Sequence, residues 1–211
     1  MIKCVLFDLD GVLVDACEWH YLSLNQAMRE IVGYDIDREQ HIAEFNGLTT
    51  RQKLTKLNID SDRSEKIWKR KQELTIETIE ENSQLDMSKR ELLGYLKASD
   101  VKVVCVTNCI RETAEMMLRK TGQHEYFDLI VTNEDVENNK PAPDCYNHAV
   151  KLIDISATNC LIVEDSPKGL QSANASSVER IWKVAGPSEV NLTNYKRIEN
   201  EGTNTNGRRG K

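Results

Sequence analysis

Five short apolar runs, spread along the 211-residue chain, constrain the fold more than any other feature. They are β-rich and lie at residues 2–7, 102–107, 127–132, 160–165 and 180–184. Helix-like stretches lie between most of them, at residues 111–122, 143–153 and 166–176. Near-continuous apolar strands that alternate with helices are typical of a parallel sheet covered on both faces. The sequence therefore predicts an α/β fold.

Residues 16–79 interrupt this alternation with helical patterns alone. Their apolar positions recur every three or four residues, which indicates amphipathic helices that pack on one another. We expect this block to be a second, smaller domain, inserted into a core made of residues 1–15 and 80–199. The last residues, 200–211, are rich in Gly, Asn and Thr, and we expect a disordered tail there.

Composition excludes several classes of protein. Hydrophobic residues make up 39% and charged residues 29% of the chain, as in an ordinary globular protein, and a net charge of -6 argues against wrapping nucleic acid. No apolar run approaches the roughly 20 residues that span a bilayer, and Asp8, Asp10 and Asp15 interrupt the start of the chain as no signal peptide would. The six cysteines contain no CxxC pair. We expect a reduced, cytoplasmic protein, monomeric or homodimeric, with no membrane or nucleic-acid partner.

Polar residues follow the predicted strands at the places where ligands bind in open α/β sheets, beyond the carboxyl ends of the strands. In chain order they are Asp8, Asp10, Thr107, Asn108, Lys140, Glu164 and Asp165. Because carboxylates that lie together repel one another, such a set needs a cation, and oxygen ligands favour Mg²⁺. Mg²⁺ commonly shares a phosphate with the protein, so phosphoryl chemistry is the expectation.

Four members of this set suit roles in phosphoryl transfer. Asp8 can attack phosphorus, and Asp10 can protonate the leaving oxygen and later activate water. Thr107 and Lys140 can hold the phosphoryl oxygens. Gly11 allows a sharp turn that exposes backbone N–H groups to the anion.

Four segments, with the sequences FDLDGVLVD, VTN, NNKPAPD and VEDSPKG, resemble in this order the motifs of the haloacid dehalogenase superfamily of phosphotransferases. The subgroup that they resemble contains β-phosphoglucomutase and phosphoglycolate phosphatase, and the similarity extends to about residue 190. The resemblance implies a Rossmann-like, doubly wound core with an α-helical cap domain between the first two motifs, where residues 16–79 lie.

The resemblance also implies roles for individual residues. Asp8 would be the nucleophile and Asp10 the general acid/base, while Thr107 and Lys140 would bind the phosphate. Mg²⁺ would be held by Asp8, the backbone carbonyl of Asp10 and Asp165, and Glu164 would help through the metal shell.

The cap offers candidates for substrate recognition. The stretch FNGLTTRQKL resembles the substrate-specificity loop of the family. His20 could face the active site or only cover the interface of the cap helices, and the basic run 69–71 could equally be a solvated face. The candidate substrate-binding residues are Gly11, His20, Gly47, Thr49, Thr50, Arg51, Lys71 and Asn108.

Two enzymatic functions fit this pattern. The first is a Mg²⁺-dependent phosphatase that hydrolyses a small phosphorylated metabolite, such as a sugar phosphate, through an aspartyl phosphate. The alternative is a phosphomutase like β-phosphoglucomutase, which needs strong cationic contacts in the cap to hold a bisphosphate. Asn46 stands where that enzyme would have a lysine and Thr50 where it would have an arginine, and the VTN motif looks more like the phosphatases, so hydrolysis is favoured. A signalling receiver domain is a remote third candidate, because the order of the acidic motifs and the helical insert both argue against it.

Overall fold

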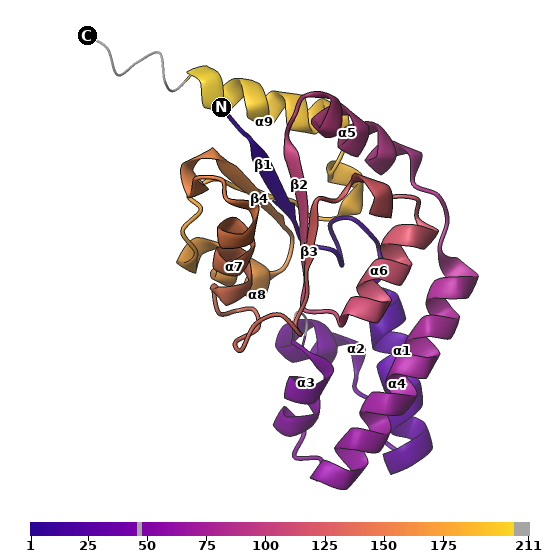
Figure 1. Cartoon of the computed structure of the whole chain (residues 1–211). Coiled ribbons are helices and arrows are strands. Elements are labelled where there is room, and N and C mark those ends of the chain that lie inside the picture. The colour runs from indigo at the N-terminus through magenta and orange to yellow at the C-terminus, as the bar shows by residue number, and fades with distance from the viewer. Residues whose placement is uncertain (46–47, 205–211) are drawn as a thin grey trace.

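The computed structural model describes residues 1–45 and 48–204, and these residues form a five-stranded parallel sheet with helices around it (Figure 1). The strand order is β3–β2–β1–β4–β5. The strands are β1 (Cys4–Phe7), β2 (Lys102–Val106), β3 (Leu129–Val131), β4 (Cys160–Glu164) and β5 (Ile181–Lys183). Each lies inside one of the five predicted apolar runs, and the predicted fold class is confirmed.

Strand β1 lies at the centre of the sheet, between β2 and β4. Phe7, its last residue, is in register with Cys105 of β2 and with Val163 of β4. The strand order reverses at β1, which is where open α/β sheets bind their ligands. The residues that follow these three strands therefore leave the sheet side by side.

The sheet is covered on both faces, so alternate residues of β1 enter two different hydrophobic clusters. Val5 and Phe7 pack on one side, whereas Cys4 and Leu6 pack on the other. The first cluster includes side chains of α5 (Met87–Ala98), α6 (Arg111–Lys120) and α9 (Leu192–Asn204). The second includes side chains of α7 (Asp144–Ile153) and α8 (Pro167–Ala175). Three short 3₁₀ segments complete this domain: η2 (His124–Tyr126), η3 (Ala157–Asn159) and η4 (Pro187–Glu189).

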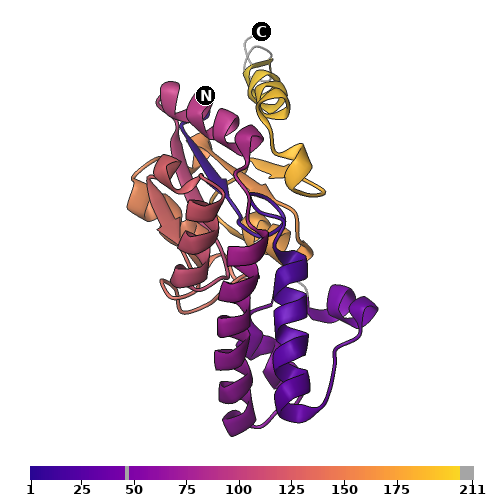
Figure 2. The ribbon, with the colours of Figure 1, turned by 90° about the vertical axis from the view of Figure 1, so that its right-hand side faces the viewer.

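The segment between β1 and α5 folds into helices that extend away from one end of the sheet (Figures 1 and 2). Helices α1 (Cys17–Val32) and α4 (Ser61–Asn82) run side by side in opposite directions, and the shorter helices lie against them. These are α2 (Arg38–Gln40), the π-helical η1 (His41–Phe45) and α3 (Thr50–Lys56). The cap has its own apolar core, which includes Leu24, Met28, Phe45, Leu54 and Ile67.

Two observations bear on the predicted boundaries. The expected cap boundary at residue 79 falls inside α4, and Ile79 packs into a cluster of the sheet domain. Helix α9 continues to Asn204 and so enters the stretch 200–211 that was expected to be a disordered tail. Tyr195 and Ile198, one turn apart, dock the earlier part of this helix on the core. Residues 205–211 lie outside the described part of the chain.

Among residues 1–45 and 48–204, no helix has both the length and the apolar character that crossing a membrane requires.

Candidate active site

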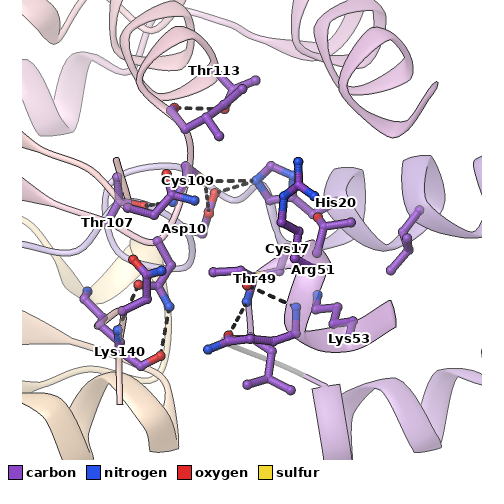
Figure 3. A pocket seen from close by; sticks show the side chains of 18 of the residues that line it. Asp10, Cys17, His20, Thr49, Arg51, Lys53, Thr107, Cys109, Thr113 and Lys140 are labelled. Atoms are coloured by element: carbon purple, nitrogen blue, oxygen red, sulfur yellow. Dashed lines mark hydrogen bonds and ion pairs between the residues drawn. The ribbon is translucent and has the colours of Figure 1, made fainter. Parts of the chain in front are cut away.

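A pocket of about 550 Å³ lies between the carboxyl edge of the sheet and the cap. Asp10, Thr107 and Lys140 line it from the sheet domain, and His20 and Lys53 line it from the cap (Figure 3). The first two predicted strand-end motifs and the Lys140 loop thus meet the cap in one cavity.

Lys140 is buried at the centre of the core side. Its Nζ donates to Asp8 Oδ1 at 2.8 Å, to Glu164 Oε1 at 2.7 Å and to the carbonyl of Val106 at 2.8 Å. Burial opposes the charge on Lys140, but the carboxylates of Asp8 and Glu164 outweigh burial and raise the pKa of Lys140. Lys140 is therefore an ammonium ion that orients the Asp8 carboxylate.

Glu164 is fully buried, and hydrogen bonds engage both of its oxygens. Oε1 accepts from Lys140 and from the Tyr146 hydroxyl at 2.8 Å, and Oε2 accepts from the backbone N–H of Asp165 at 3.1 Å. A Cβ at Gly169 would lie 2.0 Å from Oε1, so only glycine allows the first turn of α8 to pass this carboxylate. Glu164 consequently holds Lys140 in place, in addition to lying in the acidic cluster.

Oxygen atoms of Asp8, Glu164 and Asp165 lie within 4.8 Å of one another. Oδ1 of Asp165 is buried and accepts no hydrogen bond from the described residues. Burial, and then Glu164, raise the pKa of Asp165 to about 6, and burial raises the pKa of Asp8. A Cβ at Gly11, whose φ is 83°, would lie 2.2 Å from Asp165 Oδ2, so this turn is shaped around the carboxylate. An all-oxygen set with an unpartnered oxygen fits a hard divalent cation such as Mg²⁺.

The two residues after β2 serve the geometry of the site. The Thr107 hydroxyl is buried at the pocket and accepts from the backbone N–H of Cys109 at 3.0 Å. The Asn108 amide forms two hydrogen bonds of 3.1 Å with the backbone of Lys140. Asn108, predicted to bind substrate, lines the pocket and also positions the Lys140 loop.

Asp10 is contacted from both domains. Cys109 Sγ donates to Oδ2 at 2.9 Å, and His20 Nε2 lies 3.2 Å from Oδ1. Lys71 Nζ lies 3.1 Å from Nδ1 of His20, which places the imidazole proton on Nε2, facing Asp10. Burial alone would raise the pKa of Asp10, but His20, followed by Cys109 and Lys71, lower it to about 2. Asp10 is therefore ionised in this arrangement.

The other cap residues that the sequence singled out lie at the pocket with their own partners. Arg51 is exposed, with Nη2 3.0 Å from Glu65 Oε2 and the guanidinium 4.9 Å from the centre of the Trp68 ring. The Thr49 hydroxyl caps α3 by accepting from the backbone N–H of Gln52. Thr50 also lines the pocket, and Gly47 lies outside the described residues.

The pocket also contains residues that the sequence analysis did not single out, among them Cys109, Lys53 and His41. Cys109 follows Thr107 and Asn108 directly, and this position after the second motif is the sequence signal that could have placed it in the pocket. Lys53 lies one turn after Thr50 on α3, and its Nζ is 3.2 Å from His41 Nε2. Both Lys53 and His41 are buried and line the pocket, but nothing in their own residue types predicts burial.

Known proteins resemble this chain in sequence and in fold. The family model of the haloacid dehalogenase-like hydrolases matches residues 5–183. A phosphorylated carbohydrates phosphatase of Thermotoga maritima is 26% identical over 87% of this chain and 85% of the relative. The pyrophosphatase PpaX of Bacillus mycoides is 29% identical over 88% of this chain and 86% of the relative.

A solved structure with the same fold is that of β-phosphoglucomutase from Clostridium difficile, with a TM-score of 0.80 and 21% identity over 96% of this chain and 99% of that one. CbbY from Rhodobacter sphaeroides, in complex with phosphate, superposes with a TM-score of 0.76 and 21% identity, over 89% of this chain and 100% of that one. The match of the family model, together with the four motifs that converge on one pocket, shows that the chain belongs to the haloacid dehalogenase-like hydrolases.

Proposed function

We propose that this protein is a Mg²⁺-dependent phosphatase that hydrolyses a small phosphorylated metabolite through an aspartyl phosphate on Asp8. The observation that carries the proposal is the relation between two carboxylates two residues apart. Lys140 orients Asp8 from the core, and His20 orients Asp10 from the cap. A nucleophile and a proton carrier are thereby held on the same wall of one pocket.

In the first step an oxygen of Asp8 forms a bond to phosphorus while the ester P–O bond breaks. Asp10 gives a proton to the leaving oxygen. Asp10 is ionised without substrate, but the negative charge of an entering phosphate ester raises the pKa of a neighbouring carboxylate, which favours the protonated form needed here. Lys140, beside Asp8, is placed to neutralise charge on the phosphoryl oxygens.

In the second step Asp10, again a carboxylate, takes a proton from water. The water oxygen bonds to phosphorus and the acyl phosphate bond breaks, which releases inorganic phosphate and restores the Asp8 carboxylate. The hydrogen bond from Cys109 and the 3.2 Å contact with His20 stabilise the ionised form of Asp10 that this step requires. The site thus supports both halves of hydrolysis with one acid/base.

The carboxylates of Asp8 and Asp165 and the backbone carbonyl of Asp10 would hold Mg²⁺, with Glu164 beside them. Bound there, the cation would neutralise the repelling carboxylates and polarise the phosphoryl group. The unpartnered Oδ1 of Asp165 supports this assignment.

A phosphomutase is the second candidate, because Lys53 and Lys71 supply buried cations on the cap side, as a bisphosphate intermediate requires. Relatives named as phosphatases, together with the VTN motif, favour hydrolysis. The six cysteines are free thiols in the structure, which supports a reducing compartment such as the cytoplasm.

The test is a screen for phosphate release. The protein is incubated with p-nitrophenyl phosphate, sugar phosphates and pyrophosphate, with and without Mg²⁺, and sugar phosphates are also assayed for isomerisation. Asp8→Asn should lower turnover by at least about 10³-fold, because the amide cannot act as the nucleophile. The matched control is Asp15→Asn, a substitution of an exposed aspartate in the same loop. Substantial hydrolysis by pure, folded Asp8→Asn protein contradicts the proposal, and isomerisation without phosphate release favours the mutase.

A further inference from the structure

The cap wall of the pocket contains two buried ammonium groups. Lys53 of α3 and Lys71 of α4 are 7% and 6% exposed, and both line the cavity. Figure 3 shows Lys53 on the cap side, across the pocket from Lys140. Their hydrogen-bond partners are imidazole nitrogens: His41 lies 3.2 Å from Lys53, and His20 lies 3.1 Å from Lys71.

Neither buried ammonium has a carboxylate within 4.0 Å among the residues that the structure describes. Lysines elsewhere on the same two helices do have one. Lys56 of α3 pairs with Glu44 at 2.9 Å, and Lys66 of α4 pairs with Asp62 at 2.7 Å. Buried charges in proteins are ordinarily compensated by a partner of opposite charge, whereas exposed ones need none. The described residues of the cap therefore supply no carboxylate partner for these two ammonium groups, which face the pocket.

We propose that Lys53, with Lys71 beside it, binds a second anionic group of the substrate, so that this protein acts on phosphate esters whose leaving group carries a carboxylate or another phosphate. The inference rests on the proposed phosphatase function. If the transferred phosphoryl group lies against Asp8 and Lys140 on the core wall, its leaving group extends toward the opposite wall, where the two ammonium groups lie.

The two lysines differ in what their ammonium groups already do. Lys71 fixes the tautomer of His20, which in turn contacts Asp10, so Lys71 is tied to the acid/base. Lys53 contacts His41, which has no hydrogen bond to the catalytic carboxylates of the described chain, and an ammonium has three donors. Lys53 is thus the residue whose remaining donors suit a ligand.

Electrostatics support this assignment. Burial, and then Lys71, lower the pKa of Lys53 to about 8, so the ammonium form still predominates at neutral pH. An anion bound between the two lysines would favour the charged form of Lys53 and so oppose the lowering of its pKa by burial and by Lys71. Charge-assisted hydrogen bonds to that anion would be strong in this enclosed site.

The experiment compares substrates that differ only in the second anion. One pair is 2-phosphoglycolate and 2-hydroxyethyl phosphate, which have a carboxylate and a hydroxymethyl group at the same place. The other pair is fructose 1,6-bisphosphate and fructose 6-phosphate. The wild type should prefer the doubly anionic member of at least one pair, and Lys53→Met should reduce that preference in kcat/KM by about 10- to 100-fold. Lys56→Met, on the same helix but outside the pocket, should keep the wild-type preference.

The outcomes separate the inference from the function on which it rests. If the wild type has equal kcat/KM for the two members of each pair, the inference is overturned. It is also overturned if Lys53→Met lowers kcat/KM equally for both members of a pair, which would show that Lys53 only supports His41. If Lys53→Met does not fold, Lys53→Gln, which keeps a donor for His41, takes its place. Hydrolysis of p-nitrophenyl phosphate that depends on Asp8 shows that the phosphatase function survives either result, and its absence shows that the function itself has failed.

Discussion

Asn108 and Lys140 are joined by a pair of hydrogen bonds between one side-chain amide and one stretch of backbone. The Lys140 N–H donates to Oδ1 of Asn108, and Nδ2 of Asn108 donates to the Lys140 carbonyl, both at 3.1 Å. The amide thereby links the end of β2 to the loop that supplies the buried ammonium. Asn108 therefore supports the position of Lys140 Nζ, between Asp8 and Glu164, through the backbone of the Lys140 loop.

This link predicts the effect of Asn108→Ala. Two hydrogen bonds are lost, which should lower the free energy of unfolding by about 1–3 kcal/mol. Because Lys140 would no longer be held against Asp8, kcat should fall by about 10- to 100-fold, more than KM rises. Steady-state kinetics and urea unfolding measure the two effects. Asn174→Ala, on the exposed side of α8, is the control, and a variant that loses stability but keeps kcat would contradict a positioning role for Asn108.

The contact between Lys140 and Glu164 predicts strong coupling between these two residues. Lys140→Met leaves two buried carboxylates without a cation and should lower the free energy of unfolding by about 3–5 kcal/mol when no divalent ion is present. Adding Glu164→Gln removes one of these charges. The loss in free energy of unfolding of the double variant should therefore be smaller than the sum of the two single losses, by about 1 kcal/mol or more. Urea unfolding of the wild type, both single variants and the double variant, all in chelator, completes the cycle. Additive losses would mean that the pair acts independently.

The strand-end part of the site could be predicted from the sequence because it follows from local rules. A continuous apolar run such as residues 2–7 forms a buried strand, and Asp8 directly after it must lie at the edge of the sheet. The same reasoning placed Thr107 and Asp165. This reasoning did not predict that Tyr146 and Lys140 would form hydrogen bonds with Glu164. Those bonds require that residues 18 and 24 positions away from Glu164 in the sequence lie next to it in the fold.

The cap shows the limit more sharply, because Arg51 and Lys53 lie only two residues apart on α3. Helical geometry points them to different sides, and the rotation of α3 is fixed by packing of Leu54 in the cap core. Arg51 consequently turns to Glu65 and Trp68 at the surface, and Lys53 turns inward. Both residues are basic, so the sequence alone favoured the one beside the recognised loop motif.

The proposed metal site predicts a strict requirement for Mg²⁺. Without a cation, the carboxylates of Asp8 and Asp165 repel the incoming phosphate, so turnover should be lost after exhaustive chelation and return when Mg²⁺ is added. Excess Ca²⁺ should inhibit, because it prefers more ligands at about 2.3–2.6 Å, against about 2.0–2.1 Å for Mg²⁺, which disturbs in-line attack. Phosphate release is measured across Mg²⁺ and Ca²⁺ titrations, and Asp165→Asn should need more Mg²⁺ for half-maximal activity. Undiminished turnover in chelator would exclude a metal-dependent mechanism.

His41 predicts how the stability of the cap changes with pH. The ring is buried, 4.9 Å from the Tyr21 ring and 3.2 Å from Lys53 Nζ. The charged or titratable groups with the largest effect on it, Lys53, Arg38, His20 and Lys168, are basic. Burial, and then Lys53, therefore lower the pKa of His41 to about 4.

An unfolded chain binds this proton near pH 6.5, whereas the folded protein does not bind it until about pH 4. Between these values the unfolded state holds more protons, so the contribution of His41 to stability is complete above about pH 6.5 and is lost as the pH falls toward 4. The loss should reach about 3 kcal/mol, or up to about 1.4 kcal/mol per pH unit. His41→Gln, which can still accept a hydrogen bond from Lys53 but does not titrate, should lack this component. Urea unfolding of both proteins at pH 7.5, 6 and 5 isolates this component, because the contributions of the other titrating groups cancel in the difference between the two proteins. If the free energies of unfolding of both proteins change with pH in parallel, His41 is protonated as readily in the folded cap as in the unfolded chain.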